Sequence, residues 1–421
     1  MKKFICALCA FFLTSTLFAL DMPFFSGYAG FLGNFTNEAD SKDFNPELEV
    51  ESFFSAQLDF NGKFIARGEF YIDSENLLDD NIFKDITDPN ASFKIEELSA
   101  TLKTSTLRSS HYFSLFLGNY EPIGSDIFLR RQFGIHPMTS PITESWHGLS
   151  GASVYPFYGA GFSYVYHPET PWAFALYLYK NQQTAEDGSN INVINTDLRL
   201  STVRTNFIVD FAGGLAFPLD NSDDSGTQVV LIVREVQLHA GFNMLLGNRT
   251  KASAFFQGGF NKFVLSSSNG SSNSISFSDL YFLFEPRFNF RNFMLNITAF
   301  NLPRNSADDM LYLSRMATRE ETIKNLLGLN LSVITDHLYL GNTNYTFGIH
   351  TTFSFTNSDL EALKSDFKVI KDWDYDLYIT PFISMPILGG TLNGAVSVST
   401  LDLTENWLSS IYATIGFRTQ F

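Results

Sequence analysis

The chain ends in the stretch Ile411-Tyr412-Ala413-Thr414-Ile415-Gly416-Phe417-Arg418-Thr419-Gln420-Phe421. Its odd-numbered positions carry Ile, Ala, Ile, Phe, Thr and Phe, whereas its even-numbered positions carry Tyr, Thr, Gly, Arg and Gln. Successive side chains of a β-strand point to opposite faces, so this two-residue period predicts a strand with one apolar and one polar face. A soluble β protein could also end on such a strand, so the choice between a soluble protein and a membrane protein depends on the rest of the sequence.

The spacing of Thr414, Gly416 and the terminal Phe421 resembles the C-terminal signal by which bacterial outer-membrane barrels are recognised for insertion. Thr419 stands where that signal usually has a hydrophobic residue. The resemblance implies an all-β protein, a transmembrane antiparallel up-and-down β-barrel. It also implies outer-membrane lipids and the barrel-assembly machinery as partners.

The composition agrees with a barrel of this kind. The chain has 421 residues, 45 of them Phe, yet its mean hydropathy is +0.00, as expected where an apolar lipid-facing set alternates with a polar lumen set. Beyond the N-terminal segment, no stretch approaches the roughly 20 consecutive apolar residues that a spanning helix needs. A chain that crosses a membrane without such helices has to close into a barrel, because lipid cannot satisfy its backbone polar groups.

The N-terminal segment has the features of a secretory signal peptide. Two lysines precede an apolar run over residues 4–13, and Leu17-Phe18-Ala19 provides a small-residue exit. We therefore predict a signal peptide over 1–19 and a barrel over 20–421, exported through the secretory pathway and integral to the outer membrane of a Gram-negative-type bacterium. An uncleaved anchor helix is the alternative, but Thr14-Ser15-Thr16 interrupts the run. Cys6 and Cys9 both lie in this segment, which excludes disulfides and cysteine-bound metals from the exported chain.

The formal net charge is −16, and removal of Lys2 and Lys3 with the signal peptide makes it −18. Such an acidic chain is not expected to bind nucleic acid. Where part of the acidic surplus lines a pore, it would favour cations.

Eighteen segments have the two-residue period of strands, and we expect a barrel of sixteen or eighteen strands. The segments are 24–35, 47–60, 63–73, 93–103, 111–118, 158–167, 172–180, 191–201, 205–217, 229–244, 250–262, 276–289, 293–300, 327–336, 343–356, 373–385, 390–401 and 410–421. The segment 279–291 alternates most regularly, and Asn61-Gly62 is a strong hairpin signal between two others.

The connections alternate in length, as in bacterial barrels with short periplasmic turns and longer external loops. With both termini in the periplasm, the external loops are 36–46, 74–92, 119–157, 181–190, 218–228, 263–275, 301–326, 357–372 and 402–409. The longest is 119–157, and no linker to a second domain interrupts the pattern.

The start of this longest loop resembles that of bacterial porins, in which a strand ending in glycine and an aromatic leads through Pro-x-Gly into a loop folded inside the barrel. The matching residues are Gly118, Tyr120, Pro122 and Gly124. The resemblance implies passive diffusion of small hydrophilic solutes past a constriction where charges on the loop face charges on the wall. The candidates are Glu121, Asp126, Arg130 and Arg131 on the loop, and Arg67, Glu69, Glu285 and Arg287 on the wall. Alternatively, Arg130 and Arg131 pair locally with Asp126 or face outer-leaflet phosphates.

Aromatic residues cluster around the segments 158–167 and 172–180. They are Tyr155, Phe157, Tyr158, Tyr164, Tyr166, Trp172, Tyr177 and Tyr179. They fit the aromatic girdle of a membrane barrel better than a slide on which sugars stack.

Two other functions compete with a channel: a surface-exposed adhesin or antigen that displays its loops, and a barrel transporter for hydrophobic molecules. An enzyme is not expected. The seven histidines do not form a metal-binding spacing, and Ser145-Trp146-His147 has no Gly-x-Ser-x-Gly motif beside it. No cofactor is predicted, and the sequence does not choose between a monomer and a homotrimer.

Overall fold

A computed structural model describes most of the barrel wall and part of the longest loop. The described residues are 24–37, 45–74, 76–78, 91–123, 126–135, 138–142, 157–184, 190–221, 231–267, 279–303, 326–340, 343–401, 407 and 410–421. The predicted signal peptide over 1–19 and most of the long loops lie outside this part of the chain.

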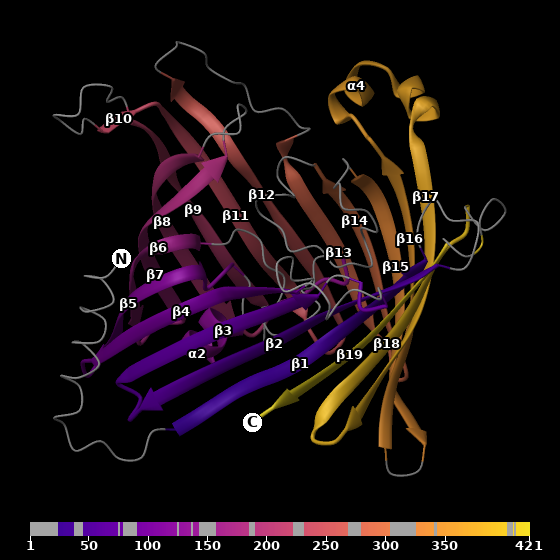
Figure 1. Ribbon diagram of the computed structural model, residues 1–421, viewed down its shortest axis with the longest axis horizontal. Coiled ribbons are helices and arrows are strands. Elements are labelled where there is room, and N and C mark those ends of the chain that lie inside the picture. Colours follow the sequence, from indigo (N-terminus) through magenta and orange to yellow (C-terminus); the bar gives the residue numbers. More distant parts are fainter. Residues whose placement is uncertain are drawn as a thin grey trace.

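One antiparallel sheet closes on itself through pairing of the first and last strands, with Phe31 opposite Phe417 (Figure 1). The strands are β1 Phe24–Asn37, β2 Pro46–Phe60, β3 Phe64–Ser74, β4 Ala91–Ser105, β5 Ser109–Tyr120, β6 Phe157–Pro168, β7 Trp172–Thr184, β8 Asn190–Arg204, β9 Phe207–Asn221, β10 Leu231–Val233, β11 Glu235–Asn248, β12 Ala252–Ser267, β13 Tyr281–Asn289, β14 Met294–Leu302, β15 Leu326–Leu340, β16 Thr343–Thr356, β17 Asp374–Ile387, β18 Gly390–Ser399 and β19 Ile411–Gln420. Both β10 and β11 pair with β9 and are separated only at Arg234, so the barrel has eighteen strands.

Every predicted strand is present, and the long connections fall at one end of the barrel. Most strands run a few residues past their predicted ends, because backbone pairing continues beyond the last residue of the apolar alternation. The main shortening is at β13, which begins at Tyr281 rather than near residue 276.

The two faces of the sheet differ as the alternation predicts. On β5, Phe113, Leu115 and Leu117 point outward and are 40%, 47% and 47% exposed, whereas Ser114 and Phe116 between them are buried on the inner face. Exposed Phe, Leu and Ile side chains continue this pattern around the outside. An exterior of this composition matches hydrocarbon rather than water.

The largest apolar core of the described chain lies inside the barrel. The eight-residue helix α2, Asp126–Phe133, belongs to the connection between β5 and β6. Its Phe128 and Leu129 are fully buried and join a cluster with inward-facing side chains of strands β5 to β15. The barrel wall therefore surrounds a loop that is packed like the core of a soluble protein.

Two short helices follow β16 at the end of the barrel opposite the C-terminus of β19 (Figure 1). They are α4, Leu360–Ser365, and the 3-10 helix η3, Phe367–Asp372. Asp359 caps α4 by accepting hydrogen bonds from the backbone N–H groups of Glu361 and Ala362. Within the described residues, no helix has the length and apolar character needed to cross a membrane.

Candidate pore constriction

The chain turns into the barrel at the end of β5. Gly118 has a φ of +96°, and a Cβ there would lie 2.1 Å from the carbonyl oxygen of Glu96, so only glycine fits the space and the backbone angle. Three residues later Glu121 also has a positive φ, 45°. These two positions direct the following segment toward the lumen.

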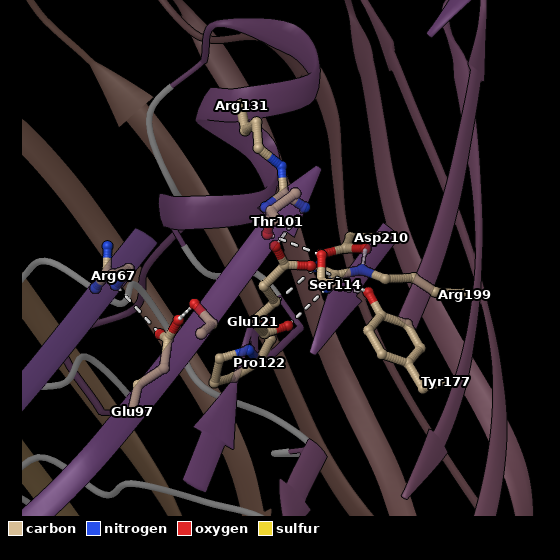
Figure 2. Close-up of polar contacts among 11 residues, drawn as sticks. Arg67, Glu97, Thr101, Ser114, Glu121, Pro122, Arg131, Tyr177, Arg199 and Asp210 are labelled. Atoms are coloured by element: carbon tan, nitrogen blue, oxygen red, sulfur yellow. Dashed lines mark hydrogen bonds and ion pairs between the residues drawn. The ribbon is translucent and has the colours of Figure 1, made fainter. Parts of the chain in front are cut away.

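Arg199 of β8 holds the start of this segment against the wall. Its side chain is fully buried and donates hydrogen bonds to both carboxylate oxygens of Asp210 on β9, at 2.8 and 2.6 Å. The same guanidinium donates to the backbone carbonyl of Glu121 at 2.6 Å and lies 3.8 Å from the ring centroid of Phe128 in α2. One arginine thus joins two strands of the wall to the inward loop (Figure 2).

The side chain of Glu121 makes a second connection. It is fully buried, forms an ion pair with Arg131 of α2, and accepts a 3.4 Å hydrogen bond from the Tyr177 hydroxyl. Arg131 also lies 5.1 Å from the ring centroid of Tyr112. Burial by itself would lower the pKa of Arg131, but the Glu121 carboxylate raises the pKa above its ordinary value. Arg131 is therefore a permanent cation.

The inward segment reaches both sides of the lumen. Arg130, exposed on α2, donates a hydrogen bond to the Tyr28 hydroxyl on β1. Farther along, Ser140 donates to the Glu285 carboxylate at 2.6 Å, and the carbonyl oxygen of Thr139 accepts from Arg287, both on β13. Because β1 and β13 stand on different sides of the closed sheet, the described parts of this loop cross the lumen.

A charged cluster on β3 and β4 lies on the inner face beside this crossing. Arg67 contacts Glu69 at 2.5 Å and Glu97 at 3.2 Å, with side chains 10%, 7% and 2% exposed. Tyr71 donates to Glu69 at 3.0 Å, and Ser99 donates to Glu97 at 2.6 Å. The cluster has two carboxylates for one guanidinium.

The inner face of β15 to β18 has a different character, dominated by neutral polar groups. Asn330 donates to Ser332 at 2.8 Å and accepts from Thr352 at 3.0 Å. Ser332 shares a 2.7 Å hydrogen bond with His350, whose ring stacks on Phe382 at 4.6 Å. The lumen is thus bordered by a charged wall on one side and a hydroxyl- and amide-rich wall on another.

No protein-family model and no curated protein sequence matches this chain. Among solved structures, OccAB3 of Acinetobacter baumannii aligns with 94% of this chain and 99% of its own, at 11% identity and a TM-score of 0.51. The outer membrane protein opdK of Pseudomonas aeruginosa aligns with 94% of this chain and 99% of its own, at 8% identity and a TM-score of 0.48. Salmonella typhi OmpF in complex with daunomycin aligns with 95% of this chain and 97% of its own, at 11% identity and a TM-score of 0.40. The chain has the fold of an outer-membrane β-barrel. At these identities, the likeness is one of fold.

Within this barrel, six of the eight candidate charges predicted from sequence form ion pairs with one another. Glu121 pairs with Arg131 of its own loop, Arg67 pairs with Glu69, and Arg287 pairs with Glu285 at 2.7 Å. Arg130 contacts Tyr28 of β1. Asp126 begins α2, and its side chain lies outside the described part.

Several inward charges were not singled out from sequence. Glu97, Arg199 and Asp210 are among them, and so is Asp197 of β8, which lies 2.7 Å from His239 of β11. The alternation of polar and apolar residues could have shown that Asp197 and Arg199 face inward. They lie on the polar face of a strand whose opposite face carries Ile194, Leu198 and Leu200. A charge on the inner row of a strand does not by itself show which loop it meets.

The aromatic cluster divides between the two faces. Phe157, Tyr177 and Tyr179 are buried on the inner face, and the rings of Phe157 and Tyr177 stack at 3.9 Å. Tyr158, which is 55% exposed, belongs to the outer row together with Tyr164, Tyr166 and Trp172. The girdle interpretation is therefore wrong for the inner three, which hold the loop in place. Tyr155 lies outside the described residues.

Proposed function

We propose that this protein is an integral outer-membrane channel for passive diffusion of small hydrophilic solutes. The observation that carries the proposal is the segment after β5, which crosses the lumen of a closed eighteen-stranded barrel with a polar inner face. Barrels of 16–18 strands are wide enough for an aqueous lumen, and an inward loop leaves a narrowed passage.

We further propose that the passage favours cations. The cluster of Arg67, Glu69 and Glu97 contains one more carboxylate than guanidinium, and the Glu121–Arg131 and Glu285–Arg287 pairs are neutral as units. A carboxylate surplus on the wall lowers the energy of a cation in the lumen. Arg130, which projects into the lumen from α2, opposes this preference at one point.

The hydrophobic-transporter alternative is less well supported by the inner face. Its apolar side chains, such as Phe128, Phe157 and Phe255, have 0% exposure because the loop and wall cover one another. A site for an apolar molecule would need these side chains uncovered. The loops on which the adhesin alternative depends lie mostly outside the described residues.

The test is single-channel conductance of the purified protein in a planar bilayer, with the reversal potential measured under a salt gradient. Stable current steps and a cation-selective reversal potential are expected. Glu97→Gln should shift the reversal potential toward anions, whereas Lys180→Gln, on the outer face, should leave it unchanged. Absence of current from protein shown by circular dichroism to be folded would contradict the channel and favour the adhesin.

Export is part of the same proposal. The N-terminal residue of the protein recovered from membranes, identified by mass spectrometry, is expected to follow Ala19. An N-terminus at Met1 would contradict cleavage. Chemical crosslinking in the membrane separates a monomer from a homotrimer.

A further inference from the structure

Basic side chains line the short-turn end of the barrel from β2 to β14. Six of them are exposed and come from five different hairpin connections, those between β2 and β3, β4 and β5, β8 and β9, β11 and β12, and β13 and β14. We call these six the basic rim: Lys63, Arg108, Arg204, Arg249, Lys251 and Arg291.

The basic rim is not neutralised by the protein. No ion pair joins any of its six members to a carboxylate within the described part of the chain. Asp59 and Glu169 are acidic residues with described side chains at the same end. Asp59 accepts a 2.6 Å hydrogen bond from the backbone N–H of Gly62, and Glu169 lies in the neighbouring turn without an ion pair to Arg108. The rim therefore presents a positive potential to whatever surrounds this end.

Half-buried or exposed aromatic rings lie next to the rim on the outer face of the same strands. Phe60 and Phe64 flank the first turn with ring centroids 5.8 Å apart, and Phe290 and Phe293 flank the last with centroids 4.6 Å apart. Phe207 begins the strand that follows Arg204 and is 36% exposed. Rings in this position sit where hydrocarbon meets headgroups, which places the basic side chains at the level of the headgroups themselves.

Among the described residues of the opposite end, basic and acidic side chains are mixed. There Lys94 pairs with Asp73 at 3.4 Å, and the helices after β16 carry Glu361 and Asp366 as well as Lys364 and Lys368. Within the described part of the chain, the uncompensated positive charge thus lies at the short-turn end.

We propose that the basic rim binds the phosphate groups of anionic phospholipids in the leaflet around the short-turn end. This inference rests on the membrane location proposed above. The rim is spread over five turns from β2 to β14. A lipid leaflet contacts the barrel along its whole circumference and can reach all of these turns, whereas an acidic protein partner would contact only one part of the circumference. Each Lys or Arg near a headgroup surface attracts anionic lipid, and the attractions add around the rim.

The test compares lipid retained by the purified protein in native mass spectrometry, after exchange into nanodiscs of phosphatidylglycerol mixed with phosphatidylcholine. The wild-type protein should retain phosphatidylglycerol over phosphatidylcholine by about tenfold or more. A variant with all six rim residues changed to glutamine should lose this preference. A matched control changes six exposed basic residues at the other end to glutamine and should keep it; they are Lys94, Lys180, Arg234, Lys364, Lys368 and Lys371.

Equal loss in both variants, or no loss in the rim variant, would overturn the proposal. If the sixfold variant does not fold, the double variants Lys63→Gln/Arg108→Gln and Arg249→Gln/Lys251→Gln should each lose part of the preference. Displacement of the lipid by millimolar inorganic phosphate would indicate a free-phosphate site instead. A wild-type protein that enters bilayers but retains both lipids equally would refute lipid binding by the rim and leave the membrane location intact. A wild-type protein that enters no bilayer would refute the membrane location as well.

Discussion

Arg199 shows what one buried charge does inside a barrel. Its guanidinium satisfies the Asp210 carboxylate and a loop carbonyl at once, in a place without exposure to solvent. Removing one partner of a buried ion pair costs about 3–5 kcal/mol, because the other charge stays buried without compensation. The loop and the wall therefore depend on the same side chain.

Arg199→Met should release the inward segment while leaving the barrel closed. The expected result is a larger and noisier single-channel current, with circular dichroism still showing a β-sheet protein. Lys180→Met, on the outer face of the neighbouring strand, is the control and should conduct like the wild type. A current unchanged by Arg199→Met would mean that the apolar contacts of Phe128 and Leu129 suffice to hold α2.

The Glu121–Arg131 ion pair permits a double-mutant cycle. Glu121→Gln leaves Arg131 as an uncompensated cation and should reduce cation selectivity, whereas Arg131→Gln should increase it. The double variant should return toward the wild-type reversal potential, because the pair is neutral as a unit. A double variant that stays as far from the wild-type reversal potential as either single variant would contradict a neutral pair.

Glycine has a special role where a hydrogen bond crosses an intervening strand. Gly214 of β9 lies in register between Asp197 and His239, and a Cβ at this position would come within 2.0 Å of Asp197 Oδ1. Gly214→Ala should therefore displace Asp197 from His239 and destabilise the barrel by about 1–3 kcal/mol.

The adjacent Gly213 provides the control, since a Cβ there meets its nearest atoms only at 3.4 and 3.5 Å. Gly213→Ala should be tolerated. The measurement is the urea midpoint of the loss of β-sheet signal in detergent for both variants. Equal midpoints would contradict the steric argument.

The strands were predictable from sequence because a closed barrel imposes the same two-residue period on every segment of its wall. The number of strands, eighteen, was also predictable, because turns such as Asn61-Gly62 separate one alternating segment from the next. The contacts of the inward loop were not predictable to the same degree. Arg131 and Glu121 are close in sequence, but the contacts between Arg199 and Glu121 and between Arg130 and Tyr28 join residues 78 and 102 positions apart. Such contacts depend on how a long loop folds back, and alternation in the strands contains no information on that path.

The last residue extends the seam that closes the barrel. Phe421 exchanges backbone hydrogen bonds with Gly27 in both directions, at 2.9 and 3.0 Å, one residue beyond the end of β19. Its ring stacks on Phe25 at 5.4 Å and on Phe54 at 5.8 Å, in space left by the missing side chain of Gly27. Thr414 and Gly416 of the predicted insertion signal pair with Asn34 and Leu32 in the same seam.

Phe421→Ala should thus lower the yield of folded barrel even without assembly machinery. The measurement is unassisted refolding into vesicles, followed by the fraction of protein that resists protease. Leu178→Ala, which removes an outward side chain that is 52% exposed and far from the seam, should refold like the wild type. A defect seen only in cells would assign Phe421 to recognition by the machinery and not to the seam.

The packed interior also dictates an order of events in time. The cluster that buries Phe128 and Leu129 draws on strands from β5 to β15, so its surface does not exist until most of the wall has formed. While the strands assemble, the segment after β5 has no complete surface to pack against. The lumen of the forming barrel is then not yet narrowed by this segment. We therefore expect seating of α2 to be the last step of folding, and a newly closed barrel to be more open before this step than after it.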